Sequence, residues 1–328
     1  MKNGVELPLP AYKDRSLGLL VFGIVEILIG AFCALLVPLS FFALTLLPSS
    51  LSSTGGLRSL IPSMVLYSVM AAVFISLGIG SIRARRWARD LMLSLSWVWL
   101  LTGICTLVFA WIFMPGLLRD LSGATAISPE GILVVGLVTT AILGFIYVLL
   151  PGAFLLFYRS RNVAETCRER DPRAQWTDNC PPRLLTLTIV WALAAVSILV
   201  VPAYRFVVPF FGVLIDGMAG ALVWVLVLAT CAAFAWGTCR RAPWAWRGAV
   251  IATLLSAIST CVTFARVTPL ELYRAMGLPE DQIALLSGIA LPEGWAMAIL
   301  WALMWSTMIG YLVSVRGLFA WVPEETTD

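Results

Sequence analysis

The sequence has no histidine and only two lysines, Lys2 and Lys13, in a chain of 328 residues. A chain without histidine cannot form a Ser-His-Asp triad, a Cys-His dyad, or a metal or haem site that relies on imidazole. Neither lysine precedes a serine or threonine, which excludes the Walker A phosphate loop. We therefore expect no enzymatic activity and no bound cofactor.

Charge of either sign is scarce as well. Charged residues make up 12% of the chain and hydrophobic residues 60%, whereas a soluble domain carries about 25% charged residues. A soluble fold could not hide so much apolar side chain, because a large part of any folded chain stays at its surface. The composition indicates an all-α integral membrane protein, a polytopic bundle of transmembrane helices.

The seven cysteines show no metal-binding pattern. There is no CxxC pair, and Cys167 and Cys180, which share a polar segment, have twelve residues between them. Most of the others lie in apolar runs, where a free thiol behaves as a small hydrophobe. We expect reduced thiols and no metal site.

Long apolar runs predict the transmembrane spans, because about 20 apolar residues of helix cross the ~30 Å hydrocarbon core of a bilayer. Eight such runs occupy residues 17–37, 62–82, 91–114, 132–157, 184–204, 218–238, 248–267 and 295–315. Apolar residues continue past Pro38 and Pro202, where proline should kink or end a helix. Segments 39–48 and 206–215 are therefore predicted to be short interfacial or re-entrant pieces.

Basic residues are distributed unevenly between the two sides of these spans. The two termini, the loops 81–90 and 239–247 and the linker 159–183 together hold 17 Lys and Arg, and the opposite side holds five. Cytoplasmic loops carry the excess of Lys and Arg in membrane proteins. We expect both termini in the cytoplasm and the chain in the cell inner membrane.

Two features are expected on the opposite side. Residues 269–276 are predicted to form a short surface helix in the long last loop. Asp216 is predicted to cap the sixth span, since its carboxylate can accept from exposed N–H groups and complement the helix dipole. A ligand role for Asp216 and an ion pair with Arg205 are the alternatives.

The chain is expected to contain two tandem four-helix units. GSIRARRWA (80–88) and GTCRRAPWA (237–245) share Gly, Arg, Trp and Ala at a spacing of 157 residues. Because each unit has an even number of spans, the repeats would be parallel, related by a pseudo-twofold axis along the membrane normal. The predicted domains are residues 1–158, a cytoplasmic linker at 159–183, and residues 184–328.

The Gly-rich second span with its basic RRWAR turn (residues 70–115) resembles a group of uncharacterised bacterial multi-pass membrane proteins with four helices. The resemblance is weaker over residues 228–265, where two of the arginines are replaced. It implies a topology and common descent, and it brings no activity and no catalytic residues.

Glu26 is the candidate ligand or proton site. It lies in the middle of the first predicted span, where an ionised carboxylate costs several kcal/mol unless it is paired, hydrated or protonated. Gly23 and Gly30 share its helical face, which favours close contact with a neighbouring helix. Glu26 is predicted either to bind a proton, a cation or a polar ligand, or to be a protonated side chain hydrogen-bonded to a neighbour. The neighbours considered are Ser94, Thr102 and Thr139.

The two basic turns are expected to anchor the chain at a membrane surface, where each basic residue adds about 1 kcal/mol of attraction to anionic lipid. The predicted anchors are Arg83, Arg85, Arg86, Trp87, Arg89, Arg240, Arg241, Trp244 and Arg247. The linker 159–183 is expected to be a solvated connector, with binding of anionic lipid or a cytoplasmic partner as the alternative. Its acidic residues dilute its charge, so no nucleic-acid partner is expected.

Two functions fit these features. The first is a transporter or channel-like protein for a small solute, ion or lipid, with its path between the two halves. The alternative is a non-catalytic scaffold or accessory subunit that binds another membrane protein, or a homo-oligomer. Trp301 and Trp305, one helical turn apart and close to Met304, either line an apolar groove or pack against neighbouring helices.

Overall fold

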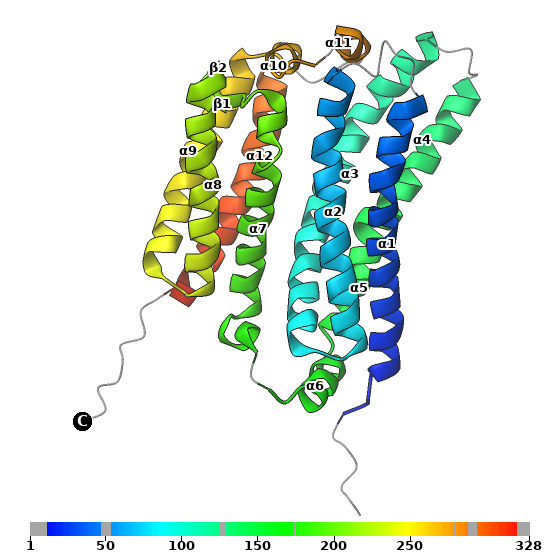
Figure 1. The fold of residues 1–328 in the computed structure, drawn as a ribbon, viewed down its shortest axis with the longest axis vertical. Coiled ribbons are helices and arrows are strands. Elements are labelled where there is room, and N and C mark those ends of the chain that lie inside the picture. Colours follow the sequence, from blue (N-terminus) through cyan, green and yellow to red (C-terminus); the bar gives the residue numbers. More distant parts are fainter. Residues whose placement is uncertain are drawn as a thin grey trace, which may run out of the picture.

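A computed structural model describes residues 12–46, 54–124, 129–173, 175–278, 280–287 and 294–319. The chain is an all-α bundle with eight helical segments long and apolar enough to cross a membrane (Figure 1). These spans are Ser16–Phe42, Leu60–Ile82, Arg86–Val108, Glu130–Tyr158, Pro182–Tyr204, Gly217–Cys239, Pro243–Arg266 and Trp295–Ser314. The predicted fold class and the eight predicted spans are confirmed.

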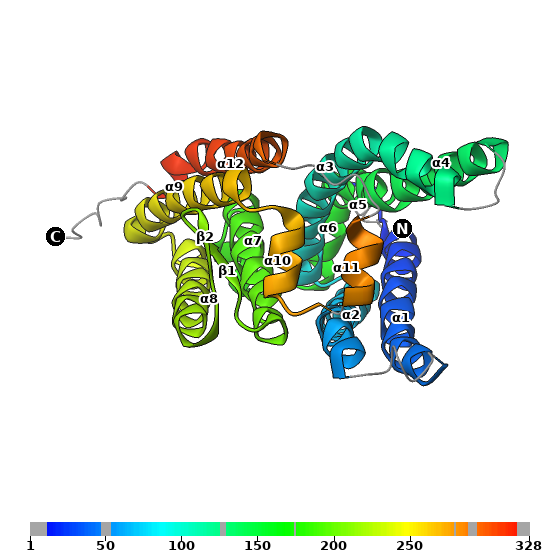
Figure 2. The ribbon, with the colours of Figure 1, turned by 90° about the horizontal axis from the view of Figure 1, so that it is seen from above.

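The helices form two groups that lie side by side (Figures 1 and 2). The first group consists of α1 (Ser16–Leu46), α2 (Thr54–Ile82), α3 (Arg86–Ala124) and a fourth span made of α4 (Pro129–Gly144), the π-helical η1 (Phe145–Leu149) and α5 (Leu150–Tyr158). The second group consists of α7 (Pro182–Ile198), α8 (Gly217–Cys239), α9 (Pro243–Arg266) and α12 (Trp295–Ser314). The main contact between the groups is made by α3 and α7.

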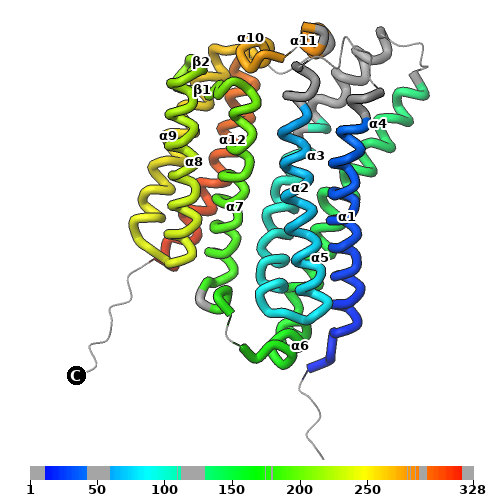
Figure 3. The backbone as a smooth tube through the Cα atoms, viewed as in Figure 1, coloured from blue at the N-terminus to red at the C-terminus, as the bar shows by residue number. Residues whose placement is uncertain are grey.

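The two ends of the bundle differ (Figure 3). One end, called the α6 end below, contains the start of α1, the turns 83–85 and 240–242, α6 (Arg161–Arg170), η2 (Trp176–Asn179) and η4 (Arg316–Phe319). The other, called the α10 end, contains η3 (Val201–Tyr204), the strands β1 (Val208–Phe210) and β2 (Val213–Ile215), α10 (Pro269–Ala275) and α11 (Glu280–Ser287).

Each group of helices has its own buried core. The first core surrounds Met92, Phe154 and Tyr158, and the second surrounds Leu184, Trp191 and Phe234. Leu91 and Ile189 pack against both. The interior is therefore two packed clusters that meet where α3 contacts α7.

The two proline positions behave differently. Pro38 lies inside α1, which continues as a helix to Leu46, so the predicted interruption is wrong for residues 39–46; residues 47 and 48 lie outside the described residues. At the second position α7 ends at Ile198, and Pro202 belongs to η3. A proline fits the first turn of such a helix because its missing N–H would have no partner there.

Residues 208–215 form a β-hairpin and not a re-entrant helix, and the interfacial position that was the other alternative stays a prediction. β1 and β2 pair antiparallel, with Val208 opposite Ile215. The hairpin tip is bonded to α9: Phe211 N–H donates to Ser259 Oγ over 2.9 Å, and Gly212 N–H donates to Thr263 Oγ1 over 2.9 Å. Side chains of α9 thus satisfy backbone groups that no strand pairs with.

The fourth span is interrupted by its π-helical segment. Leu150 N–H donates to the carbonyl of Phe145, and Pro151 follows with no N–H of its own. The proline leaves the carbonyl of Tyr147 without its usual helical donor. Gly103 of α3 lies directly against this carbonyl. A Cβ at residue 103 would be only 2.1 Å from the oxygen, so no larger residue fits there without a shift of the backbone.

The features predicted on the α10 end are met in part. The short helix predicted at 269–276 is α10, which begins with a reciprocal capping box between Thr268 and Glu271. Asp216 occupies the N-cap position of α8, but its side chain makes no capping hydrogen bond. The ion pairs between described residues do not include Arg205 with Asp216; the Arg205 guanidinium lies against Gly277 instead.

Candidate functional site

Glu26 forms a closed ring of contacts with Ser81 and Tyr158, from α1, α2 and α5. Ser81 Oγ lies 3.0 Å from Glu26 Oε2, and the Tyr158 hydroxyl lies 2.6 Å from Glu26 Oε1. The two hydroxyls are 2.8 Å apart. All three side chains are buried, with exposed fractions of 0%, 1% and 0%.

The ring has a definite proton requirement. All three O···O distances fall in the range of O–H···O hydrogen bonds. Ser81 and Tyr158 can each donate one proton, whereas an ionised carboxylate can donate none. Two protons cannot make three hydrogen bonds, so the ring is complete only when Glu26 carries the third. In that state each of the three groups donates once and accepts once.

Small residues bring α1 and α2 together around Glu26. A Cβ at Gly23 would lie 2.9 Å from the carbonyl oxygen of Gly78, and a Cβ at Gly30 would lie 2.9 Å from the backbone nitrogen of Ile75. The face of α1 that carries Gly23, Glu26 and Gly30 is therefore packed against α2. This backbone contact leaves the carboxyl within reach of a side chain as short as serine.

Glu26 lies closer to the α6 end of the bundle than to the α10 end. Its partners are the penultimate residue of α2 and the last residue of α5, both at the α6 end. Glu26 is the eleventh residue of α1, which has 31 residues. Within the apolar span Ser16–Phe42 it lies close to the midpoint, so its predicted mid-span position stays a prediction.

The partners of Glu26 were also not those considered from the sequence. Ser94 Oγ contacts the carbonyl of Pro182 at 3.4 Å, and Thr102 Oγ1 donates to the carbonyl of Val98 at 2.8 Å. The sequence did offer a signal for Tyr158, because it is a polar aromatic residue at the exact close of an otherwise apolar span. Its pairing with a glutamate in the first span is visible only in three dimensions.

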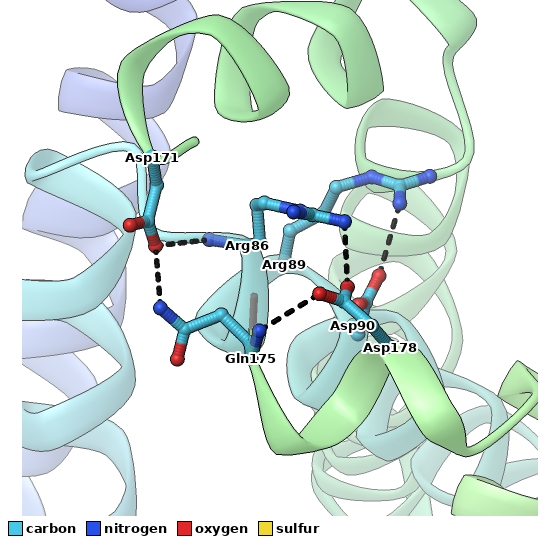
Figure 4. A network of polar contacts seen from close by, with 6 residues as sticks. All are labelled: Arg86, Arg89, Asp90, Asp171, Gln175 and Asp178. Atoms are coloured by element: carbon cyan, nitrogen blue, oxygen red, sulfur yellow. Dashed lines mark hydrogen bonds and ion pairs between the residues drawn. The ribbon is translucent and has the colours of Figure 1, made fainter. Parts of the chain in front are cut away.

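The first basic turn is bonded to the linker that joins the two halves (Figure 4). Asp171, 1% exposed, lies 3.1 Å from Arg85 Nη1 and accepts from Gln175 Nε2 at 3.2 Å. It also accepts from the backbone N–H of Arg86, the first residue of α3, at 3.3 Å. A buried carboxylate at this place caps the helix as well as pairing with an arginine.

Two further arginines of this turn are engaged. Arg86 Nη2 lies 2.7 Å from Asp178 Oδ1, and Arg89 Nη1 lies 2.9 Å from Asp90 Oδ1 (Figure 4). Arg89 Nε donates to the backbone carbonyl of Tyr158 at 3.2 Å, which links the turn to the Glu26 ring. Arg83 is exposed. Arg85, Arg86 and Arg89 therefore have carboxylate partners within the chain; that all the turn's arginines anchor a membrane stays a prediction.

The segment before α1 is fastened to α6. The hydroxyl of Tyr12 donates to Glu169, Arg15 N–H donates to Thr166 Oγ1 over 3.1 Å, and Arg170 Nη2 lies 3.3 Å from Asp14 Oδ2. Hydrogen bonds from the backbone and hydroxyl of Ser16 lower the pKa of Asp14 below its ordinary value.

The linker is therefore not the solvated connector that we expected. Val163, Thr166 and Cys167 of α6 are buried against the first half.

Burial raises the pKa of the Cys167 thiol from 9.0 to about 11. Cys180 packs in the second core, and burial with a hydrogen bond to Cys239 raises its pKa to about 12. No group of three or more Cys, Asp and Glu among the described residues could hold a metal ion.

The second basic turn has the backbone of the first. Ala84 and Arg241, 157 residues apart, have φ values of 50° and 55°. Arg85 N–H donates to Gly80 O, and Ala242 N–H donates to Gly237 O, both at 2.9 Å. At both turns a Cβ on the glycine would strike the alanine eight residues further on, Ala88 at 2.5 Å and Ala245 at 2.6 Å. The residues matched in the sequence thus form the same local turn, and the division of the chain into two parallel repeats stays a prediction.

The surroundings of the two turns differ. At the place where Arg86 donates to Asp171, the second turn has Pro243, which has no N–H to donate. The ion pairs between described residues include Arg85, Arg86 and Arg89 but neither Arg240 nor Arg247. Arg240 lies over the ring of Trp236 at 4.3 Å.

Two apolar grooves flank the contact between α3 and α7. The first, called the α2–α7 groove, has a volume of about 440 Å³ and is lined by residues such as Met70, Trp87 and Ile189. The second, called the α3–α12 groove, has a volume of about 580 Å³, and Trp301 and Met304 line it. No charged residue among those described lines either groove, and Glu26 lines neither.

Comparisons of the chain with protein-family models, with curated proteins and with solved structures gave no match.

Proposed function

We propose that this chain is a multi-pass membrane protein that holds or moves a membrane lipid by taking an acyl chain into the grooves between its two halves. The observation that carries the proposal is the pair of grooves on either side of the contact between α3 and α7. Their volumes of about 440 and 580 Å³ fall in the range of ligand sites. The proposal contains no catalytic step.

The chemistry of the groove walls favours an apolar occupant. Apart from Ser76 and the indole of Trp87, only aliphatic side chains line the α2–α7 groove. The α3–α12 groove has aromatic and thioether walls, with Trp301 stacked on Phe264 at a centroid distance of 5.5 Å. The hydroxyl-bearing side chains in the two linings are Ser76, Tyr273 and Thr307, so a polar solute would leave most of its hydrogen-bonding groups without partners, which costs free energy.

Glu26 supports the lipid variant over the ion variant of the predicted transporter. Both carboxyl oxygens of Glu26 are bonded to Ser81 and Tyr158, and the side chain is fully buried. A carboxyl that already uses its bonding capacity within the protein is a poor binding site for a passing cation.

Cross-linking tests this function. The protein is reconstituted with phosphatidylcholine that carries a diazirine on its acyl chain, and the labelled peptides are identified by mass spectrometry. We expect labels on residues that line both grooves, and a loss of the labels in the α3–α12 groove alone when Ile104→Trp fills it. Leu137→Trp on α4, where residue 137 is 63% exposed and lines neither groove, is the matched control. Equal labelling of all exposed helix faces would contradict the proposal.

One observation favours the second candidate, a scaffold that binds another membrane protein. α4 leaves the bundle beyond η1 and packs mainly on α3 (Figure 2). Its side chains Leu133, Val135 and Leu137 are 61%, 52% and 63% exposed. A partner protein whose helix docks on α4 would co-purify with the chain in native lipid particles at a fixed ratio. Leu137→Trp would abolish this co-purification.

A further inference from the structure

The second basic turn presents an exposed cluster that the first turn lacks. The cluster, called the α8–α9 patch, consists of Trp236, Arg240, Arg241, Trp244 and Arg247. Its three arginines are exposed, and its two tryptophans are 54% and 48% exposed. The indole rings lie 6.5 Å apart, centroid to centroid. The patch therefore combines three positive charges with two large aromatic faces at the α6 end of α8 and α9.

The aromatic residues give the patch a defined depth in the membrane. Tryptophan side chains concentrate at the level of the lipid headgroups, where one side of the ring is apolar and the other is hydrated. Trp236 lies one turn before the end of α8, and Trp244 lies in the first turn of α9. Arg240 and Arg241 lie between the two tryptophans in the chain, so we expect them at the level of the lipid phosphates. The ring of Trp236 holds the Arg240 guanidinium at 4.3 Å.

The first turn has the same backbone but already has anions of its own. The carboxylates of Asp171, Asp178 and Asp90 pair with Arg85, Arg86 and Arg89. Linker residues supply two of these three carboxylates. In the second copy no described carboxylate pairs with Arg240 or Arg247, so an anion from outside the described chain fits there.

We propose that the α8–α9 patch binds the phosphate of an anionic phospholipid headgroup, and that the turn at residues 83–86 does not. Guanidinium groups bind phosphate oxygens with paired N–H donors, and the two indoles contact the glycerol backbone beside that phosphate. The two similar turns thus have different partners. The turn at residues 83–86 binds the linker, and the α8–α9 patch binds lipid.

The test measures binding of phosphatidylglycerol to the full chain in a non-ionic detergent, by native mass spectrometry and by the shift of the unfolding temperature, with phosphatidylcholine as the neutral lipid. The variant R240Q/R241Q/R247Q removes the charges of the patch. The matched control R159Q/R161Q/R168Q removes three exposed arginines at the same end of the bundle. We expect the patch variant to lose about tenfold to about a hundredfold in affinity for phosphatidylglycerol, and the control to keep it.

Three results would overturn the proposal. Equal losses in the two variants would mean that only the net charge of this end matters. A stabilisation of the wild type by inorganic phosphate alone, lost in the patch variant, would identify a soluble anion in place of a lipid. Binding of phosphatidylglycerol that begins only after deletion of residues 320–328 would mean that the carboxylates of Glu324, Glu325 and Asp328 occupy the patch instead.

Discussion

The hydroxyl of Tyr158 lies 2.6 Å from Oε1 of Glu26, although 132 residues separate the two in the sequence. With Ser81 they close a buried ring that joins α1, α2 and α5. The same residue, Tyr158, accepts from Arg89 through its carbonyl. A polar site inside the first half is thereby joined to the basic turn below it.

The first prediction concerns the proton on Glu26. We expect Glu26→Gln to lower the free energy of unfolding by about 1–2 kcal/mol, because the amide carbonyl and one N–H can serve the ring while the second buried N–H has no partner. We expect Glu26→Ala to cost about 2–4 kcal/mol, because the buried hydroxyls of Ser81 and Tyr158 lose partners and a cavity forms.

Infrared spectroscopy checks the same point directly. The wild type should show the carbonyl stretch of a protonated carboxylic acid, which Glu26→Gln removes. If Glu26→Gln also abolished a pH-dependent solute flux in proteoliposomes, Glu26 would be a transported-proton site, and its interpretation as a protonated side chain that only bonds its neighbours would be wrong.

The second prediction separates the two linker aspartates. Asp171 is buried and accepts from Arg85, Gln175 and a backbone N–H, so Asp171→Ala should destabilise by about 3–5 kcal/mol. Asp178 is 25% exposed at its side chain, so Asp178→Ala should cost no more than about 1 kcal/mol and less in high salt. Denaturant unfolding of both variants in the same detergent measures the difference.

The third prediction uses two glycines within helices. Gly103→Ala would place a methyl 2.1 Å from the carbonyl oxygen of Tyr147, so the backbones of α3 and η1 must separate, and we expect a loss of about 2 kcal/mol or more. Gly144→Ala meets nothing within 4 Å and should be neutral or stabilise by up to about 1 kcal/mol. Equal effects of the two substitutions would show that the close contact with the Tyr147 carbonyl does not decide the result.

The fourth prediction concerns two buried thiols outside the membrane spans. The pKa values of Cys167 and Cys180 are raised to about 11 and about 12. Above about pH 9 the unfolded chain therefore releases thiol protons that the folded chain retains, so stability should fall as the pH rises towards those values. The variant C167A/C180A should show a smaller fall.

Maleimide labelling gives an independent readout of the same two residues. Near pH 8 both thiols should react slowly in the folded protein, because the reactive species is the thiolate and both side chains are buried. Rapid labelling of Cys167 in the native state would mean that α6 detaches from the first half.

The sequence predicted the spans and the matching turns well, because both are local signals. An apolar run of span length is readable without its neighbours, and Gly80 and Gly237 each meet an alanine eight residues further on. The partners of Glu26 were not predictable in the same way, since they lie 55 and 132 residues away.

Docking of the linker was missed for a related reason. The number of charged residues in the linker suggested a solvated segment. Asp171 is nevertheless buried, because it pairs with Arg85 and accepts from the backbone N–H of Arg86, and both residues lie outside the linker. That the second turn has Pro243 where the first has Arg86 was visible in the sequence. Its meaning, the loss of an N–H that binds Asp171, required the position of the linker.

The linker contacts also bear on the order in which the chain is assembled. Every bond of α6 and η2 to the first half described above is made by residues 12–178. These residues leave the ribosome before the second group of helices is made. A nascent chain can thus form the contacts of α6 and η2 with its first four spans while translation of the remainder continues. The second group of helices then packs against a first group whose linker contacts are already formed.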